Sequence, residues 1–350
     1  MCSLFQKIIL YILYKMEHDR TLLAPFYILQ GKPSIQTIQD ANLYQLNRFF
    51  GLYKRISKTA YDKQIEFFLQ EQWIVQTDKS YTFTKEGRLQ ASSIENYIQN
   101  LQIDGKNLHK MTEEFYFRFL LLIQVWTNRK AGIKHYVPII EQKEVENWVK
   151  WFYVQTRHDV TSFLSDLYKE LTNVLEGINE ESLIIFIQTI SNAEEIGATK
   201  QQLQEQFHLT KEDVDLTVIE VIHYILMQIE ETKHPILTKI ASFDSSDKKL
   251  TSSAQQTQNL LEQGYNVQDI ARMRRLKENT IHDHIVEIAL HTPNFPYEHY
   301  VQASNIREIE NTVASLNTFK LKDIKQMVDE RITYFQIRLV LTRLQKEGEQ

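Results

Sequence analysis

Apolar residues recur along most of this chain every three or four positions, which is the period of amphipathic helices. Near the start, this spacing is set by Leu4, Ile8, Tyr11 and Ile12. It predicts a buried first helix, because Lys7 and Lys15 leave the run too short to span a bilayer. A second apolar run, residues 115–126, reads as a central core helix. The pattern as a whole predicts a mainly α fold.

A shorter, alternating pattern breaks the helical period between residues 73 and 83. A helix is expected first, with its apolar face formed by Tyr61, Ile65, Phe68 and Leu69. Two short strands follow, at residues 73–75 and 81–83, around a polar turn at 78–80, and residues 84–87 are expected to close the hairpin. A helix that leads into a two-stranded hairpin predicts a winged-helix-like domain over residues 1–95.

This expected winged helix carries no clear DNA-binding face. Its exposed positions form a mixed set that leans acidic: Asp62, Lys63, Glu66, Gln70 and Glu71. Contact with DNA and packing against protein therefore both stay open for this domain.

Residues 100–240 are expected to form a helical middle domain. Two stripes at helical spacing predict its core: Trp148, Trp151, Phe152 and Gln155, and then Phe163, Leu167, Leu171 and Val174. A second helix-turn-helix is a candidate at residues 199–226, where Thr199 and Thr210 are placed to cap two helices. Its outer residues 211–215 are acidic, so this copy is expected to be structural.

A polar stretch separates the middle domain from a C-terminal module. Residues 234–254 lack a long apolar run and contain two Ser pairs and several charges, which indicates a boundary near 244–250. The module is expected to fill residues 250–350. Helical spacing continues to its end, where Ile337, Val340, Leu341 and Leu344 form an apolar face.

Residues 266–286 of this module have the spacing of a helix-turn-helix. Ile270 is followed six residues later by Leu276, and Leu276 five residues later by Ile281. This spacing buries one residue in each helix and one in the corner, while Ala271 allows the two helices to approach closely. An ordinary helical hairpin is the alternative. Gly264 is expected to end the preceding helix with a positive φ.

Two stretches carry a resemblance to known families. Residues 260–285, with the pattern LxxGYxxxxIAxxRxLxxxTIxxHI, resemble the helix-turn-helix at the C-terminal end of RecQ-type helicases. Residues 31–51, GKPSIQTIQDANLYQLNRFFG, are similar to the YpbB family of bacterial proteins. That resemblance implies a chain of about this length that ends in the helicase-type domain and is often encoded beside a RecQ-type helicase gene.

Charge limits the nucleic-acid hypothesis to a local patch. The chain has a net charge of −5, and residues 248–350 hold 14 Lys and Arg against 13 Asp and Glu. Four cations nevertheless fall within six residues: Arg272, Arg274, Arg275 and Lys277. Phosphate binding needs several cations in one place, so this turn is the candidate backbone contact. A solvated turn without a ligand is the alternative.

The second helix would supply the remaining candidate DNA contacts. These are Glu278, Asn279, Thr280, His282 and Asp283, of which the first two and last two are expected to face the groove. Asn279 has the chemistry to read adenine, whereas the carboxylates oppose phosphate. Arg274 and Arg275, on either side of Leu276, are expected to project outward.

Catalytic motifs are missing from the sequence. There is no GxxxxGK[ST], GxGxxG, GxSxG or HExxH pattern, so neither an enzyme nor a nucleotide or other cofactor is expected. His282 and His284 are two residues apart and should point away from each other on a helix, which argues against a shared metal. The lone Cys2 fits a reducing cytosol.

Two functions are therefore left open by the sequence. The first is a cytoplasmic or nucleoid-associated DNA-binding accessory protein that acts on duplex or junction DNA with a RecQ-type helicase in replication or repair. The second is a protein-interaction scaffold that uses its helix-turn-helix folds for docking without binding DNA.

Overall fold

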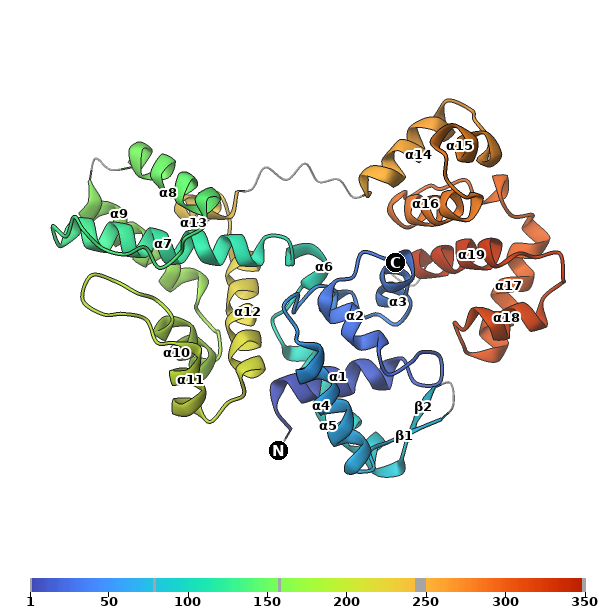
Figure 1. Ribbon diagram of the computed structural model, residues 1–350, viewed down its shortest axis with the longest axis horizontal. Helices are drawn as coiled ribbons and strands as arrows, with labels where there is room; N and C mark the ends of the chain where they lie inside the picture. Colours follow the sequence, from blue (N-terminus) through green and yellow to red (C-terminus); the bar gives the residue numbers. More distant parts are fainter. Residues whose placement is uncertain (1, 78–79, 157–158, 243–249, 348–350) are drawn as a thin grey trace.

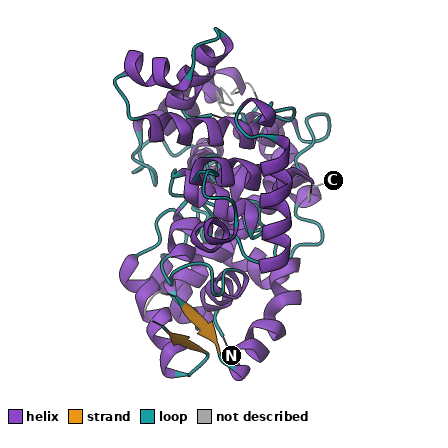
Figure 2. Ribbon diagram, turned by 90° about the vertical axis from the view of Figure 1, so that its right-hand side faces the viewer, coloured by secondary structure: helices purple, strands orange, loops and turns teal. Residues whose placement is uncertain are grey.

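The computed structural model describes residues 2–77, 80–156, 159–242 and 250–347. These residues are mainly helical, and the strands among them form a single antiparallel hairpin (Figure 2). Three hydrophobic cores follow one another along the chain. The predicted fold class is thus confirmed. No helix in the described ranges has the length and apolarity needed to cross a membrane.

The N-terminal unit, residues 2–104, is built around the first helix, in which Ile9, Leu10, Ile12 and Leu13 are 0% exposed. Its helices and strands are α1 (Leu4–Lys15), α2 (Ala24–Gln30), α3 (Ile35–Leu43), the 3-10 helix η1 (Asn47–Phe49), α4 (Lys58–Gln70), β1 (Ile74–Gln76), β2 (Tyr81–Phe83) and α5 (Lys85–Asn100).

The predicted hairpin is present, with Ile74 opposite Phe83 and Gln76 opposite Tyr81. Of residues 84–87, expected to close it, only Thr84 does so: its amide donates to the Trp73 carbonyl at 3.0 Å. Residues 85–87 already belong to α5, which Thr84 caps by accepting from the Gly87 amide at 3.0 Å. Gly87 lies directly against strand β1, since a Cβ there would come within 1.9 Å of the Trp73 carbonyl oxygen. Of the expected turn 78–80, residues 78 and 79 lie outside the described residues.

The middle unit, residues 105–242, surrounds Trp126, which is 0% exposed. Its helices are α6 (Gly105–Leu108), α7 (Thr112–Lys130), α8 (Lys143–Thr156), α9 (Val160–Val174), α10 (Glu180–Gln188), α11 (Lys200–Phe207), α12 (Lys211–Gln228) and α13 (Pro235–Ala241). The second predicted stripe is buried, but the first was partly wrong. Trp151 is 57% exposed because Val145, Val149 and Phe152 define the buried face of α8.

The candidate helix-turn-helix in the middle unit has the expected corner. Thr199 and Thr210 both form capping boxes at the starts of α11 and α12. His208 has a φ of +53°, and the Leu209 amide donates to the Gln204 carbonyl at 3.1 Å. Gln204, in place of a small residue, therefore does not prevent the corner from forming.

The C-terminal module, residues 250–347, has its own core around Ile270, Ile281 and Ile285, each 0% exposed. Its helices are α14 (Ser252–Glu262), α15 (Val267–Arg274), α16 (Glu278–His291), the 3-10 helix η2 (Tyr297–His299), α17 (Ala303–Leu316), α18 (Leu321–Met327) and α19 (Tyr334–Glu347). Of the predicted linker 234–254, residues 243–249 lie outside the described residues, whereas its two ends belong to α13 and α14. The domain boundaries drawn from the sequence stay predictions.

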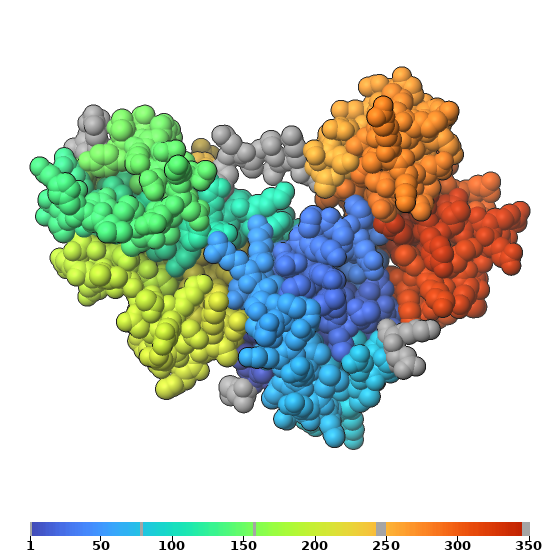
Figure 3. Space-filling view, in the orientation of Figure 1, coloured from blue at the N-terminus to red at the C-terminus, as the bar shows by residue number. Residues whose placement is uncertain are grey.

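The N-terminal unit lies between the other two units, although it comes first in the sequence (Figures 1 and 3). Its helix α1 contacts α12 of the middle unit, and its helix α3 contacts α16 and α19 of the C-terminal module. Both of its neighbours therefore present the second helix of a helix-turn-helix to it. This arrangement decides which helix faces are available for DNA.

Candidate nucleic-acid interface

The corner between α15 and α16 has the geometry that the spacing predicted. Asn266 caps α15, Arg275 has a φ of +53°, and the Leu276 amide donates to the Ala271 carbonyl at 2.9 Å. A non-glycine residue at this φ costs roughly 1 kcal/mol. The middle corner has the same φ at His208, so the two motifs share one backbone conformation. Gly264 has a φ of +88°, as expected for the end of the preceding helix.

Three of the four predicted cations project from this corner. Arg272 and Lys277 are exposed, and so is Arg275 at the left-handed position. Arg272 pairs with Asp269 at 2.6 Å, but its side chain stays 77% exposed, so this ion pair contributes little to stability. We call Arg272, Arg275 and Lys277 the basic turn. It lies beside the N-terminus of α16, whose positive dipole end also favours phosphate.

Arg274 does not project outward, and that expectation was wrong. Its guanidinium turns onto α14, where it donates to the Ser253 carbonyl at 2.8 Å, the Ser253 hydroxyl at 2.9 Å and Gln256 Oε1 at 3.1 Å. It also donates to the hydroxyl of Thr257. The reason is helical spacing: Arg274 comes four residues after Ile270 and so shares its inward face. Arg274 holds the motif together.

His284 lies at the end of this buried network. Its Nδ1 accepts from the Thr257 hydroxyl at 2.8 Å, since that hydroxyl already receives a hydrogen bond from Arg274. Burial lowers the pKa of His284, and the charge of Arg274 lowers it further. The imidazole is therefore neutral and structural. His282 lies against Phe335 of α19 instead, so the two histidines point apart as their spacing predicted.

Half of the expected reading face of α16 contacts another part of the protein. The ring of His282 stacks on Phe335 of α19 with centroids 4.1 Å apart, and Asp283 accepts from Arg338 of α19 at 2.6 Å. The expectation that these two residues face the groove was wrong, because α19 packs along that side of α16. Glu278 and Asn279 are exposed as expected. Only the first turn of α16 is open to DNA.

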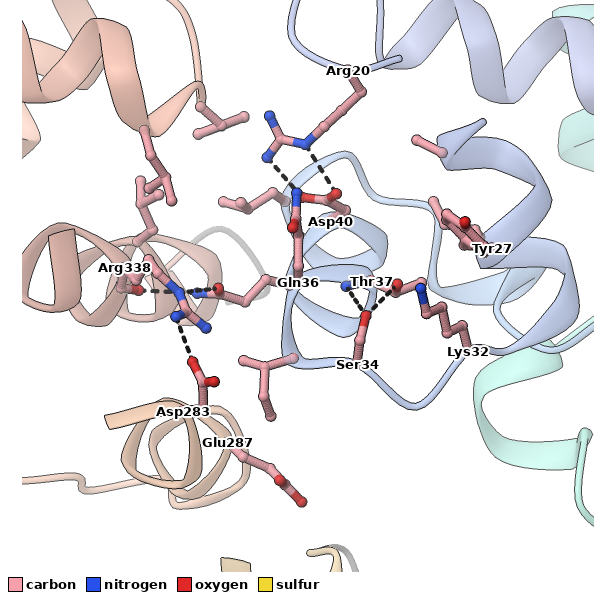
Figure 4. Close-up of a pocket in the computed structure, with 18 of the residues that line it drawn as sticks. Arg20, Tyr27, Lys32, Ser34, Gln36, Thr37, Asp40, Asp283, Glu287 and Arg338 are labelled. Atoms are coloured by element: carbon pink, nitrogen blue, oxygen red, sulfur yellow. Dashed lines mark hydrogen bonds and ion pairs between the residues drawn. The ribbon is translucent and has the colours of Figure 1, made fainter. Parts of the chain in front are cut away.

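Thr280, the last predicted site residue, lines a cavity of about 970 Å³ between the N-terminal unit and the C-terminal module. We call this the α3–α16 cavity (Figure 4). Asp283, His284 and Glu287 line it from α16, and α2 and α3 form the facing wall. Gln39 of α3 crosses beside it, with its amide 3.0 Å from the Arg338 carbonyl.

No local pattern in the sequence predicted this cavity. Gln39 and Arg338 are 299 positions apart, and no local pattern relates two residues at such a distance. The nearest sequence feature is the resemblance of residues 31–51 to the YpbB family, because this stretch contains α3, which forms one wall of the cavity.

Comparison with known proteins supports the helix-turn-helix in the C-terminal module. Residues 253–341 match a protein-family model described as a helix-turn-helix domain. No solved structure matches the chain. Over 345 residues, 97% of each chain, the protein is 29% identical to Protein YpbB of Bacillus subtilis (strain 168), and is thus similar to it from end to end.

Proposed function

We propose that this protein is a non-catalytic DNA-binding accessory protein whose basic turn contacts the phosphate backbone of duplex DNA. The main support for this proposal is that Arg272, Arg275 and Lys277 are exposed together at the corner of a helix-turn-helix. This corner approaches the backbone in DNA-bound helix-turn-helix proteins, where the N-terminal residues of the second helix reach base edges. The matched helix-turn-helix family supports the same use of the domain.

Sequence preference should be weak. Base reading needs side chains along the outer face of the second helix, and here His282 and Asp283 are engaged with α19. Asn279 is the one exposed amide on the first turn of α16, and Glu278 beside it repels phosphate. Backbone contacts position a protein without selecting sequence, so binding should depend on charge and DNA shape.

Removing the basic turn should abolish most duplex affinity without unfolding the protein. The slope of log K against log salt is negative, and each lost phosphate contact makes it shallower by about 0.9. Arg272→Ala/Arg275→Ala/Lys277→Ala should therefore make it shallower by up to about 2.7. The measurement is duplex binding by the full chain at several salt concentrations, with circular dichroism to confirm folding.

The matched control removes the same charge elsewhere. Lys130, Lys134 and Lys143 are exposed and have no carboxylate partner among the described residues, so their triple alanine variant should bind DNA like the wild type. Equal losses in both variants would show nonspecific charge attraction. An unchanged salt slope in the basic-turn variant would remove the basic turn from the mechanism.

The partner that we propose is a RecQ-type helicase, acting with this protein in replication or repair. Its support is the resemblance of residues 260–285 to the C-terminal helix-turn-helix of such helicases. The full chain should co-elute with a purified RecQ-type helicase on forked DNA during size-exclusion chromatography. Separate elution, with or without DNA, would contradict this partnership.

One observation favours a docking scaffold as the second candidate. In the middle unit, α12 already uses its outer face for protein contact: Asp213 accepts from the Phe5 amide at 2.8 Å, Asp215 accepts from the Tyr53 hydroxyl at 2.8 Å, and Leu216 enters the N-terminal core. A helix-turn-helix therefore serves as a docking surface within this protein. If the wild type fails to bind duplex DNA at low salt, the docking scaffold replaces the DNA-binding accessory protein as the proposed function.

A further inference from the structure

We propose that the α3–α16 cavity binds a single-stranded DNA segment that continues from a duplex held at the basic turn. This inference rests on the proposed function, because the duplex must be placed before its strand can enter. The preferred DNA is therefore a duplex with a single-stranded tail, as found at a fork.

The cavity has the size and the walls that such a segment needs. Its volume of about 970 Å³ lies at the upper end of the range of roughly 300–1,000 Å³ seen for ligand sites. Two aromatic rings line it, Tyr27 from α2 and Phe319 from the start of the α18 segment. Aromatic rings beside cations are the usual means of holding single strands, because every base has a face that can stack.

The carboxylates of the cavity are neutralised or hydrogen-bonded by the protein itself. Each has a partner: Asp19 the Phe319 amide, Asp40 the Arg20 guanidinium, Asp283 the Arg338 guanidinium and Glu287 the Thr251 amide. These contacts turn the acidic oxygens toward protein donors. A phosphate that enters therefore meets acids whose charge is already partly compensated.

The cations at the rim are not compensated in this way. Lys32 and Lys322 line the cavity from opposite units, both are exposed, and neither has a carboxylate partner among the described residues. The Lys32 amine lies 3.9 Å from the centroid of the Tyr27 ring, so charge and a stacking surface occur together (Figure 4). Lys320 also lines the cavity but, unlike these two, it pairs with a carboxylate, that of Asp323 at 3.7 Å.

The cavity is also continuous with the basic turn along α16. Lys277 precedes α16, and Thr280, within its first turn, lines the cavity. A strand that leaves the duplex at the basic turn therefore needs to pass only one helical turn to reach the opening.

The experiment compares the full chain bound to a blunt duplex and to the same duplex with a single-stranded tail. The wild type should bind the tailed DNA about tenfold more tightly, given the usual strength of base stacking. Lys32→Ala/Lys322→Ala should lose most of this gain and keep the affinity for blunt duplex. Its salt slope on tailed DNA should fall by about 1.4, at about 0.7 for each single-strand contact.

Two further variants separate a general effect of charge from the effect of the aromatic ring. Lys134→Ala/Lys143→Ala removes the same charge away from the cavity and should leave the tail gain intact. Tyr27→Leu keeps an apolar side chain but removes the ring, so it should reduce the tail gain without changing the salt slope.

The outcomes distinguish this inference from the proposed function. Loss of blunt-duplex binding only in the basic-turn variant, with an equal tail gain in the wild type and in Lys32→Ala/Lys322→Ala, would overturn the cavity and leave the function standing. Displacement of the tail by an unlabelled oligonucleotide, but not by a free mononucleotide, supports a strand site. Equal displacement by the mononucleotide would overturn the strand in favour of a nucleotide site.

Discussion

Replacing Arg274 with alanine should lower the unfolding free energy of the C-terminal module by about 2–3 kcal/mol, since hydrogen bonds from a charged group are worth about 1.5–3 kcal/mol. The Arg274 guanidinium supplies donors to Ser253, Gln256 and Thr257 of α14. Thr257 is 0% exposed and hydrogen-bonds to His284, so water cannot easily replace the lost donor. The loss therefore reaches three helices.

Hydrogen exchange of α14, α15 and α16 in increasing urea would measure this effect within the full chain. Arg272→Ala is the matched control. It removes the same charge only two residues from Arg274, but the Arg272 side chain is 77% exposed. It should change stability by less than about 0.5 kcal/mol. Equal protection in the two variants would mean that the Arg274 network contributes nothing to the fold.

Acidification should destabilise the packing of the middle unit against the N-terminal unit through His223. This residue is 0% exposed, and burial lowers its pKa to about 4. Its Nδ1 accepts from the Asp104 amide at 3.1 Å, so the proton resides on Nε2, 2.9 Å from the Thr112 hydroxyl. Thr112 donates onward to the Leu108 carbonyl at 2.8 Å. A protonated imidazole cannot accept the Asp104 bond.

Acidification lowers the stability because the unfolded chain binds a proton at His223 before the native chain does. Above pH 6.5, the ordinary pKa of histidine, both folded and unfolded chains are neutral at this position. Between pH 6.5 and 4 the unfolded chain gains a proton that the native His223 does not, so stability falls as the pH falls. At 1.36 kcal/mol per pKa unit, the total loss approaches about 3 kcal/mol near pH 4.

Urea unfolding between pH 7.5 and 4, followed by tryptophan fluorescence, measures this loss, because Trp126 and Trp148 lie in the middle unit. His223→Gln should flatten the pH dependence, and it should be less stable than the wild type at pH 7.5. The control His135→Gln removes an exposed histidine and should keep the wild-type profile. If His223→Gln also keeps that profile, another group sets the acid sensitivity.

The helix-turn-helix corners could be predicted from the sequence because each depends on contacts within about 20 residues. Ile270, Leu276 and Ile281 are spaced to fill one corner, and Leu203 and Leu209 begin the same pattern in the other. Arg274 could have been placed as well. Its position four residues after Ile270 assigns it to the inner face, but its charge was taken as a sign of exposure.

The candidate site was predictable only where it is local. Arg272, Arg275 and Lys277 are exposed because a corner of two short helices leaves little protein to cover them. His282 and Asp283 were misplaced because their partners, Phe335 and Arg338, belong to a helix more than 50 residues later. Helical spacing identifies the inner face of α16 but not whether a later helix covers the outer one.

By itself, the sequence determined the helices, their caps and the corners, since hydrophobic period and capping act between neighbours along the chain. Only the tertiary structure decided that the N-terminal unit lies between two helix-turn-helix motifs and that a cavity separates α3 from α16. Gln39 meets Arg338 across 299 positions. Such contacts depend on the shapes and charges of whole folded surfaces, which no periodic pattern in the chain records.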